Sequence, residues 1–478
     1  MPPHDIPSPV ASDEDDLERF TPVLALLQLS EIPGAAARLW ATKNPEKTLS
    51  GLPVVGGPLH GSYHILFPVE FPEQGAKWLL KIPINGAAEH WDELSAEQLQ
   101  SEARTMQFIK RRTSIPLPEV FGFSTSLANP LGCPHIWLSF IPGVSLYDFW
   151  FNTPPTADDD DDALHRRRIQ ILKDVASAMV QLGQLRFPKG GRLVFDAGDD
   201  NGDPVGVGPQ RQLDDAACQK RLMRDPPDYM PVYFAAGPFK TAREFYTCPL
   251  EREAMPPLAI LAGQQRLLRF LLDCMADFFE GVKGGGEEFV LTHPDFDIQN
   301  FIVSPTDGRL VGIIDWDGVG AWPVSLGNLR YPGWLTRDWD PGMYGYGEDG
   351  VLADGVTRED SPETLQRCRW AYWKAVRDSL EELEAGQAGS REGKGGGEYE
   401  TSATIITENL HIAAAGNGRA NILKKIVDEI AAVVDVPCEN GPEFFYMELA
   451  MAGQGEWKDG VKEALRAGLE TLLRDQLL

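Results

Sequence analysis

The chain has 478 residues, 43% of them hydrophobic, and is therefore long enough for one large two-lobed domain or for two domains. Its 44 Lys and Arg residues against 71 Asp and Glu residues give a net charge of −27, which argues against a nucleic acid as partner. The six cysteines are widely spaced without a Cys-x-x-Cys pair, a pattern that argues against a disulfide framework or a zinc site.

The N-terminal residues, MPPHDIPSPVASDEDDLERF, are acidic and rich in proline, without the basic start and apolar core of a signal peptide. We expect residues 1–19 to form a disordered acidic N-terminus. No apolar run approaches the length of a membrane span, so the sequence predicts a cytoplasmic protein without a membrane partner.

A strand hairpin and a helix are predicted in the first third of the chain, after an apolar helical segment over residues 20–42. A Gly-rich turn at 56–64 enters a strand at 65–71, and a second strand at 78–82 completes the hairpin. A helix follows at 96–112, with Ser95 as its expected N-cap. Backbone N–H groups of Gly-rich turns can approach phosphates, but taken alone this turn is better explained as a plain hairpin turn.

The remaining elements are mostly helical. Strands are predicted at 117–123 and 135–140, and helices at 163–184, 262–279, 364–384, 405–434 and 457–477. Ser361 and Pro362 have the positions of an N-cap and a first helical residue. Residues 201–239 predict a long irregular connection, and the low-complexity residues 385–399 predict a flexible linker.

A polar loop between short apolar runs lies in residues 289–317, FVLTHPDFDIQNFIVSPTDGRLVGIIDWD. His293, Asp295 and Asn300 have the spacing H-x-D-x-x-x-x-N, and Asp315 closes the third apolar run, so we expect all four side chains at one hairpin mouth. In phosphoryl transfer from a nucleotide, one carboxylate orients the acceptor hydroxyl, here Asp295. An Asn and a second carboxylate, here Asn300 and Asp315, hold Mg²⁺ on the phosphates. The alternative is that these are ordinary turn residues.

The segments HPDFDIQN and IIDWD resemble the catalytic loop and the metal-binding segment of the aminoglycoside phosphotransferase and choline kinase superfamily. The resemblance covers roughly residues 56–341. It implies an α+β, two-lobed, protein-kinase-like fold, with a small antiparallel-sheet lobe over 20–141 and a large, mainly helical catalytic and substrate lobe over 142–478. It also implies an ATP- and Mg²⁺-dependent phosphotransferase acting on a hydroxyl group of a small molecule, with Asp295 and His293 in its catalytic loop.

The resemblance assigns two further groups of residues to the nucleotide. Gly61, Ser62 and Tyr63 match a loop that lies over the nucleotide in the family. At the next position the family usually has Asn, and this chain has His64 instead. Lys81 matches the strand lysine that contacts the phosphates.

Glu102, on the predicted helix, would pair with Lys81 as the corresponding residues do in kinases, and Glu97 is the rival partner. The segment from Ser139 to Ile141 resembles the linker between lobes, whose backbone groups bond to the adenine edge.

The acceptor is not identified by these motifs. Several carboxylates near or after the loop favour a cationic acceptor such as an amino sugar or amino alcohol. The alternative is that they face water. They are Asp297, Asp317, Asp428, Asp435, Glu443 and Glu448.

Two other functions remain open. A protein kinase has the same loop spacing, but here Pro294 replaces the Arg of His-Arg-Asp, and Trp316 and Asp317 replace Phe-Gly. The second alternative is a non-catalytic nucleotide-binding scaffold. The presence of all four polar residues argues against it.

Overall fold

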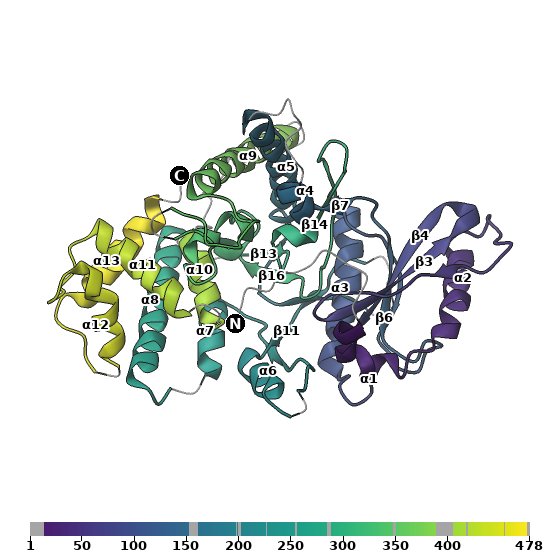
Figure 1. The fold of residues 1–478 in the computed structure, drawn as a ribbon, viewed down its shortest axis with the longest axis horizontal. Coiled ribbons are helices and arrows are strands. Elements are labelled where there is room, and N and C mark those ends of the chain that lie inside the picture. The colour runs from purple at the N-terminus through teal and green to yellow at the C-terminus, as the bar shows by residue number, and fades with distance from the viewer. Residues whose placement is uncertain are drawn as a thin grey trace.

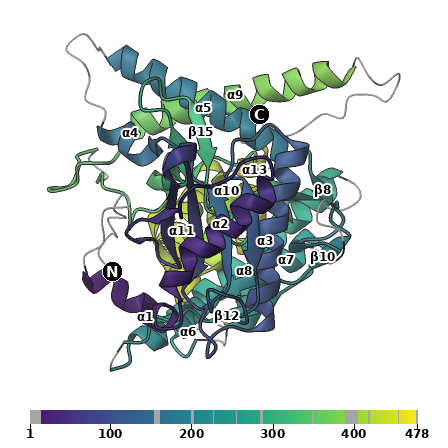
Figure 2. The ribbon, with the colours of Figure 1, turned by 90° about the vertical axis from the view of Figure 1, so that its right-hand side faces the viewer.

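A computed structural model describes residues 14–152, 161–196, 198, 202–225, 227–253, 256–283, 288–347, 350–388, 405–416, 419–453 and 455–475. The α+β, kinase-like architecture expected from the sequence is confirmed, because a small lobe built on an antiparallel sheet packs against a larger, mainly helical lobe (Figure 1). In Figure 1 the small lobe lies on the right, and Figure 2 shows the molecule from that side.

The small lobe is built on a six-stranded sheet of order β1-β3-β4-β6-β5, with β2 paired to β3. Its strands are β1 (Val54–Val55), β2 (Leu59–His60), β3 (His64–Phe71), β4 (Ala76–Pro83), β5 (Val120–Ser124) and β6 (His135–Ser139). The predicted β3–β4 hairpin is present and runs in register from the pair His64 and Pro83 to the pair Phe71 and Ala76.

The N-terminal segment covers this sheet and corrects one expectation. Residues predicted to be disordered form the 3-10 helix Glu14–Phe20, which ends in a fully buried Phe20; residues 1–13 lie outside the described part. The helices α1 (Thr21–Leu24), the 3-10 turn Leu29–Glu31 and α2 (Ile32–Lys43) follow. Trp40 of α2 packs on Phe71 and Trp78, with ring centroids 4.5 and 5.5 Å apart. Apolar residues thus anchor a segment whose acidic composition had suggested disorder.

No single helix among the described residues has the length and apolar composition needed to cross a membrane. Two helical segments, Leu17–Leu24 and Leu29–Lys43, reach that length and composition only when they are taken together, and they are bent by 77° relative to each other.

Helix α3 (Glu93–Arg112) begins earlier than predicted because Asp92, not Ser95, is its N-cap. The Asp92 carboxylate accepts a hydrogen bond of 2.8 Å from the Ser95 backbone N–H, and the Ser95 hydroxyl accepts one of 3.0 Å from the Asn85 amide. Such a cap satisfies one of the backbone donors that a helix start leaves without a partner. The predicted apolar face of α3 is buried in the core.

The polar loop of the central motif joins two different sheets. β13 (Phe289–Thr292) lies between β8 (Arg186–Phe187) and β16 (Gly320–Pro323), whereas β14 (Phe301–Val303) lies between β15 (Leu310–Ile313) and β7 (Val144–Ser145). The expectation of one hairpin is therefore right for β14 and β15 and wrong for β13.

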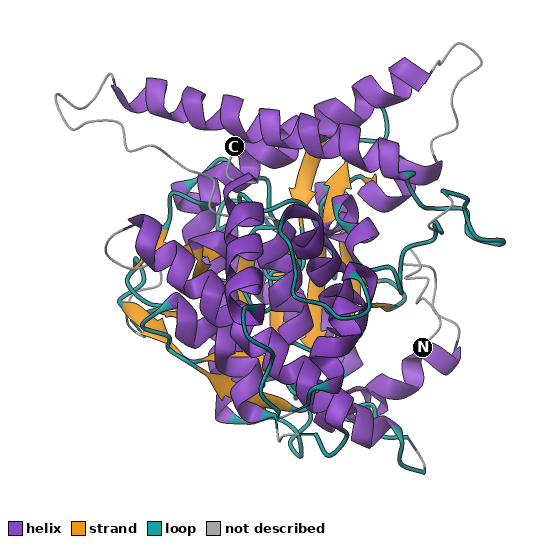
Figure 3. Cartoon of the chain, turned by 90° about the vertical axis from the view of Figure 1, so that its left-hand side faces the viewer, coloured by secondary structure: helices purple, strands orange, loops and turns teal. Residues whose placement is uncertain are grey.

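The large lobe is completed by helices, which Figure 3 shows in front of its strands. They are α4 (Leu146–Asn152), α5 (Asp161–Leu182), α7 (Ala242–Arg252), α8 (Ala259–Lys283), α9 (Pro362–Ala388), α10 (Ile405–Ala414), α11 (Arg419–Val433), α12 (Phe445–Met451) and α13 (Val461–Asp475). Short 3-10 helices occur at Pro72–Gln74, Ile298–Asn300, Val324–Leu326, Gly333–Leu335, Arg337–Trp339 and Pro442–Phe444.

Helix α9 confirms its predicted start and corrects its predicted end. The Ser361 hydroxyl accepts a hydrogen bond of 3.2 Å from the Thr364 backbone N–H, as an N-cap does. The helix continues through residues 385–388, which were expected to belong to a flexible linker, and residues 389–399 of that linker lie outside the described part.

The segment expected to be an irregular connection contains regular elements. β10 (Gly206–Gly208) pairs with β9 (Arg192–Val194), which precedes the expected connection, and β11 (Gln210–Leu213) pairs with β12 (Tyr233–Ala236). Helix α6 (Asp215–Leu222) lies between β11 and β12 in the chain. β11 and β12 are four residues long, too short for an alternating pattern to be recognised in the sequence.

Candidate active site

The predicted catalytic loop and the predicted metal-binding segment meet at the backbone of Ile314. Its N–H donates a hydrogen bond of 2.9 Å to the Asn300 carbonyl, and its carbonyl accepts one of 3.0 Å from Nε2–H of His293. His293 is fully buried, and its ring packs edge-on against that of Trp316 with centroids 4.6 Å apart. Burial lowers the pKa of His293, so the neutral imidazole is favoured. The structure therefore places His293 behind Asp315, as a residue that positions the segment.

Asp295 lies at the surface and is oriented by Asn300. The Asn300 side-chain amide donates a hydrogen bond of 2.8 Å to the Asp295 carboxylate and one of 2.9 Å to the Asp295 carbonyl. Gln299 adds a longer bond of 3.3 Å to the same carboxylate. Asn300 is buried while Asp295 is exposed, so the loop presents one carboxylate to solvent and fixes its direction from below.

Lys81 connects the two lobes. Its ammonium lies 2.8 Å from the Glu102 carboxylate on α3 and 3.2 Å from the Asp315 carboxylate. Lys81 is 6% exposed and Glu102 3% exposed. Burial alone would lower the pKa of Lys81, but the two carboxylates outweigh it and raise that pKa, so the ammonium stays charged. The alternative partner, Glu97, pairs with Arg192 instead.

Asp315 has an unusual backbone conformation. Its φ of +59° is the one positive value among the described residues other than glycine. Such a conformation costs of the order of 1–3 kcal/mol and is often found at functional sites, and Asp tolerates it better than most residues. The next residue, Trp316, is 1% exposed and donates a hydrogen bond of 2.8 Å to the Ile313 carbonyl. The turn therefore buries Trp316 while Asp315 contacts Lys81.

Asp317 has a partner that the sequence did not reveal. Arg211, on β11, donates hydrogen bonds of 3.0 and 3.1 Å to the two Asp317 oxygens. Nε2 of His64 lies 3.8 Å from the same carboxylate. Burial would raise the pKa of Asp317, but Arg211, His64 and Lys81 outweigh it and lower the pKa to about 2. Nothing in the local sequence links residues so far apart in the chain.

The predicted nucleotide turn is exposed. Gly61, Ser62 and Tyr63 connect β2 to β3, and the Gly61 N–H donates a hydrogen bond of 2.9 Å to the His64 carbonyl. A Cβ at Gly61 would meet no atom within 4 Å, so open space lies beside this turn.

The predicted adenine-binding linker follows β6. The Ser139 backbone N–H and hydroxyl are both bonded to the Glu119 backbone, at 2.9 and 2.8 Å. The Phe140 N–H donates to the Lys77 carbonyl at 3.1 Å. Ile141 packs over Gly312 of β15, where a Cβ would clash with its side chain. Two backbone donors of this linker are thus already used within the protein.

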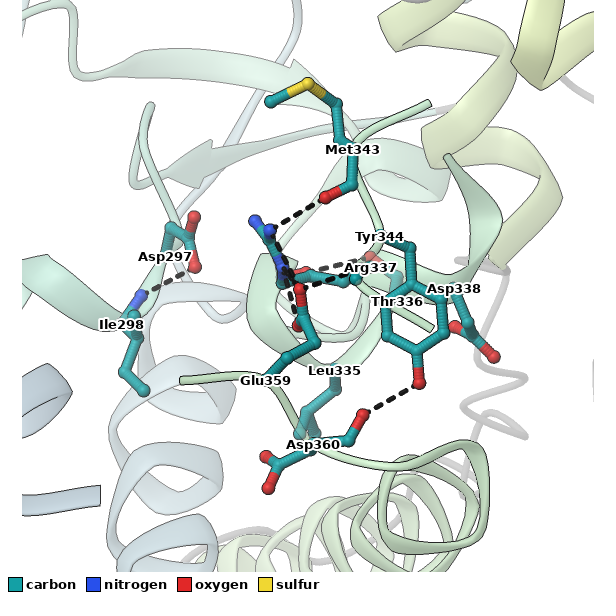
Figure 4. A network of polar contacts seen from close by, with 12 residues as sticks. Asp297, Ile298, Leu335, Thr336, Arg337, Asp338, Met343, Tyr344, Glu359 and Asp360 are labelled. Atoms are coloured by element: carbon teal, nitrogen blue, oxygen red, sulfur yellow. Dashed lines mark hydrogen bonds and ion pairs between the residues drawn. The ribbon is translucent and has the colours of Figure 1, made fainter. Parts of the chain in front are cut away.

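A second carboxylate, that of Asp297, is two residues after Asp295 and lies on the side of Arg337 (Figure 4). It accepts a hydrogen bond of 2.7 Å from the Ile298 backbone N–H. Arg337 is held by Glu359, through bonds of 2.9 to 3.2 Å, and by the Met343 carbonyl at 3.2 Å. Burial raises the pKa of Asp297 to about 6, with Asp295 acting in the same direction.

The other carboxylates predicted around an acceptor are not brought together. Asp428 pairs with Lys424 at 2.6 Å on the exposed side of α11, and Glu448 accepts a hydrogen bond of 2.8 Å from Asn440. Asp435 and Glu443 are exposed in the same C-terminal region. Only Asp297 of the set stays beside the catalytic loop without a basic residue within ion-pair distance in the described part. Helical periodicity in the sequence could not show which face of these helices meets the loop.

One family model matches the part of the sequence that carries this site. The sequence model of the phosphotransferase enzyme family covers residues 72–325, which is more than half of the chain and includes the site from Lys81 to Asp317. A solved aminoglycoside phosphotransferase mutant in complex with ADP and hygromycin B is 12% identical, with a TM-score of 0.37 over 92% of this chain and 98% of that chain. Plasmodium vivax ethanolamine kinase is 11% identical, with a TM-score of 0.36 over 89% and 84%. These structural scores are too low to support an activity.

Curated relatives correct the predicted location. The altered inheritance of mitochondria protein 9, mitochondrial, of Eremothecium gossypii is 26% identical over 28% of this chain and 21% of its own length. A subtelomeric hrmA-associated cluster protein of Aspergillus fumigatus is 23% identical over 50% and 53%. The chain thus matches a fifth to about half of the length of these relatives. The mitochondrial name of the first contradicts the cytoplasmic location, which had been predicted from the absence of a targeting pattern.

Proposed function

The chain belongs to the phosphotransferase enzyme family, and from this premise we propose that it transfers the γ-phosphate of ATP, with Mg²⁺, to a hydroxyl group of a small molecule. The observation that carries the proposal is the continuous set of contacts from Glu102 through Lys81 to Asp315, beside the Asp295 and Asn300 pair. A charged lysine for the phosphates thus lies at the same site as a carboxylate for the acceptor.

Four residues of the site have a task in the proposed reaction. Lys81 supplies a permanent positive charge to the α- and β-phosphates, and Glu102 fixes its direction. Asp295 accepts a hydrogen bond from the acceptor hydroxyl and receives its proton as the phosphoryl group is transferred. Asn300 keeps the Asp295 carboxylate in one orientation until the metal and nucleotide bind.

The chemistry of the residues present fits Mg²⁺. Among the described residues, no group of three or more His, Cys, Asp or Glu side chains gathers as a ready metal cage. Asn300 and Asp315 instead offer a sparse pair of oxygen ligands, joined through Ile314, and Mg²⁺ usually keeps its other positions for water and phosphate. When bound, Mg²⁺ would neutralise charge on the phosphates.

The acceptor is proposed to be a polar hydroxyl compound with a cationic group close to Asp297. Asp297 is two residues from Asp295, and among the described carboxylates of the predicted acidic set it is the one beside the loop with no basic residue within ion-pair distance. The Arg337 side chain lies nearby and is 39% exposed. Its positive charge would repel the cationic group of an acceptor on the same side. The acceptor contacts are therefore proposed to be local to the loop and the 298–339 region, not to the C-terminal helices.

The test is ADP release from Mg²⁺-ATP with a library of small hydroxyl compounds that contains matched amine and neutral pairs. We expect release that depends on the compound, on Mg²⁺ and on Asp295. A preference for the amine member should weaken at high salt and in Asp297→Asn, because both changes reduce the Coulomb attraction. Equal rates for matched amine and neutral compounds would contradict the cationic acceptor, while the absence of any stimulated release would contradict the phosphotransferase activity.

The alternative of a nucleotide-binding scaffold makes a different prediction. A scaffold would bind Mg²⁺-ATP without losing its γ-phosphate in a single-turnover assay with the compound library. A protein kinase would instead label a peptide or protein substrate. A scaffold does not explain why Asp295 is exposed and oriented by Asn300. A protein kinase would share this arrangement, but Pro294 replaces the Arg of its His-Arg-Asp motif here.

A mitochondrial location is part of the proposal and rests on the name of the Eremothecium gossypii relative. Fractionation of cells that express the full chain with a C-terminal tag checks it. Enrichment with a mitochondrial matrix or membrane marker is expected, and exclusive recovery with soluble cytosolic markers would contradict it.

A further inference from the structure

The segment from Arg192 to Ala236, called here the bridge segment, contacts both lobes. It contains β9 to β12 and α6, and Figure 1 shows β11 between α3 and the large-lobe helices. Directly before it, Gly191 exchanges backbone hydrogen bonds of 2.9 and 2.8 Å with Ala321 of β16. Gly191 has a φ of +141°, and a Cβ there would clash with the Gly208 carbonyl oxygen. The bridge segment is thus fixed to the strand that follows Asp317.

On the small-lobe side, the bridge segment bonds to the part of α3 that carries Glu102. Three α3 residues within five positions of Glu102 take part. Glu97 pairs with Arg192, Gln98 accepts a hydrogen bond of 3.3 Å from the Arg211 backbone N–H, and Ser101 donates one of 2.8 Å to the Leu193 carbonyl. Gln98 and Ser101 are almost fully buried, so water does not compete for these bonds.

Arg211 belongs to both sets of contacts. Its backbone bonds to α3, while its side chain donates to both oxygens of Asp317. The guanidinium lies 4.1 Å from the ring centroid of Tyr233, and the Arg211 side chain is 6% exposed. Arginine suits such a place because it stays charged, stacks on aromatic rings and directs several donors at one carboxylate. One residue therefore connects α3 with the end of the metal-binding segment.

The bridge segment also approaches the exposed nucleotide turn. Arg211 of the bridge segment bonds to the Asp317 carboxylate, and burial raises the pKa of Tyr63, with Cys218 and Asp215 of α6 and Asp317 acting in the same direction. The same carboxylate of Asp317 lies 3.8 Å from His64 at the end of that turn. Three parts of the nucleotide site, α3, the turn at 61–63 and the 315–317 segment, thus adjoin one segment of the chain.

We propose that Arg211 is a positioning residue of the phosphate-binding site, through which the bridge segment keeps α3 and the 315–317 segment in mutual register before the nucleotide binds. The consequence for nucleotide binding rests on the proposed function. Lys81 contacts Glu102 on α3 and Asp315 on the segment, so its two partners stay in place only while these elements keep their relative positions. In protein kinases the position of the corresponding helix is a point of control, whereas here a buried connection within the chain sets it.

His64 does not replace Arg211 as the partner of Asp317. Burial lowers the pKa of His64 to about 4, so its imidazole is neutral near pH 7. Without Arg211, the Asp317 carboxylate would be left partly buried beside a neutral ring, a situation that strongly favours rearrangement toward water. Movement of Asp317 displaces Asp315, two residues earlier, and with it one of the two contacts of Lys81.

The experiment compares Arg211→Gln, Arg211→Lys and the double variant Arg211→Gln with Asp317→Asn. Hydrogen exchange of α3 and of residues 61–64 is measured without nucleotide, and the Kd of Mg²⁺-ADP is measured by calorimetry. The matched control is Arg224→Gln, which removes an exposed arginine of the same segment that pairs with Asp228 at 3.2 Å.

We expect Arg211→Gln to speed exchange in α3 by about tenfold or more, and to weaken Mg²⁺-ADP binding by a similar factor while the fraction of binding-competent protein stays unchanged. Arg211→Lys should be intermediate. The double variant should recover part of the protection, because it removes the uncompensated charge. Arg224→Gln should match the parent protein.

The proposal is overturned if α3 exchange in Arg211→Gln equals that of the parent. It is also overturned if exchange rises while the Kd of Mg²⁺-ADP is unchanged, since the connection would then not serve the nucleotide site. A parent protein that binds no nucleotide contradicts the proposed function instead, and the exchange data then decide alone whether Arg211 orders α3. Should Arg211→Gln fail to fold, the comparison of Arg211→Lys with the parent decides by the same two measurements.

Discussion

The His293 imidazole donates its hydrogen bond to the carbonyl of Ile314, 3.0 Å away and one residue before Asp315. The first residue of the predicted catalytic loop therefore fixes the backbone that presents the proposed metal-binding carboxylate. Because the Ile314 N–H also donates to the Asn300 carbonyl, His293 and Asn300 are both bonded to the backbone of the residue that precedes Asp315. Changes at Asp295, Asn300 or Asp315 are for this reason best made with side chains of similar size, so that the loss of a charge can be separated from the loss of this connection.

Asp295→Asn should lower turnover by about two to four orders of magnitude while the affinity for Mg²⁺-ATP stays nearly unchanged. Asparagine keeps the size of the side chain but cannot accept the hydroxyl proton. Steady-state rates and calorimetry check the two parts. Asp307→Asn, at an exposed turn in the β14–β15 hairpin, is the matched control. If Asp295→Asn kept more than about a tenth of the parent rate, proton acceptance would have to be assigned to another residue, first of all to Asp297, two positions further on.

Asp315→Asn should remove the Mg²⁺-dependent part of nucleotide binding without unfolding the protein. Asparagine tolerates the positive φ of this position, so the backbone turn is retained while the metal loses its charged ligand. Calorimetric titration with ADP, with and without Mg²⁺, measures the difference between the two affinities. A difference equal to that of the parent would show that the metal is not bound by Asp315.

Glu408→Gln should change how stability depends on pH. Glu408, on α10, is 7% exposed, and burial raises its pKa to about 7 even though Arg330 Nε lies 3.8 Å away and lowers it. The folded protein then binds this proton more tightly than the unfolded chain, so the carboxyl group lowers stability progressively as pH rises from about 4.5 to 7. Glutamine does not titrate, so this loss should be absent in the variant.

Unfolding by urea at pH 5, 6, 7 and 8 measures the effect. The stability of the parent minus that of Glu408→Gln should fall by of the order of 1–3 kcal/mol over this range. Glu463→Gln, at an exposed position of α13, should give a difference that is independent of pH. A parallel pH dependence in parent and Glu408→Gln would show that Glu408 is already ionised at pH 5.

Gly191→Ala should destabilise the protein by about 2–4 kcal/mol. The residue has a φ of +141°, and its added methyl group would meet the Gly208 carbonyl oxygen of the neighbouring strand. Gly206→Ala in the same strand pair is the control, because a Cβ there meets no atom within 4 Å. Urea midpoints compare the two variants, and equal midpoints would mean that the connection between β9 and β16 adapts without strain.

The sequence by itself determined the local chemistry of the central motif. His293, Asp295, Asn300 and Asp315 could be selected because the spacing of polar residues at the ends of short apolar runs is a local property. The same holds for the β3–β4 hairpin and for the start of α9, where turn and capping residues act within a few positions of each other. Glu102 was a candidate beside Glu97, and helical periodicity alone could not choose between them.

Only the tertiary structure decided which elements meet. It chose Glu102 over Glu97 for Lys81, placed β13 and β14 in different sheets, and brought Arg211 to Asp317 across 106 positions of the chain. Long-range pairings of this kind have no local signature, because they depend on how whole faces of helices and sheets are buried against one another. The charges in the sequence likewise did not show which carboxylates lie at the site, because most carboxylates of a chain with net charge −27 can face water. Only the packing of the folded chain shows that a few of them, such as Asp297 and Asp317, are buried beside the site.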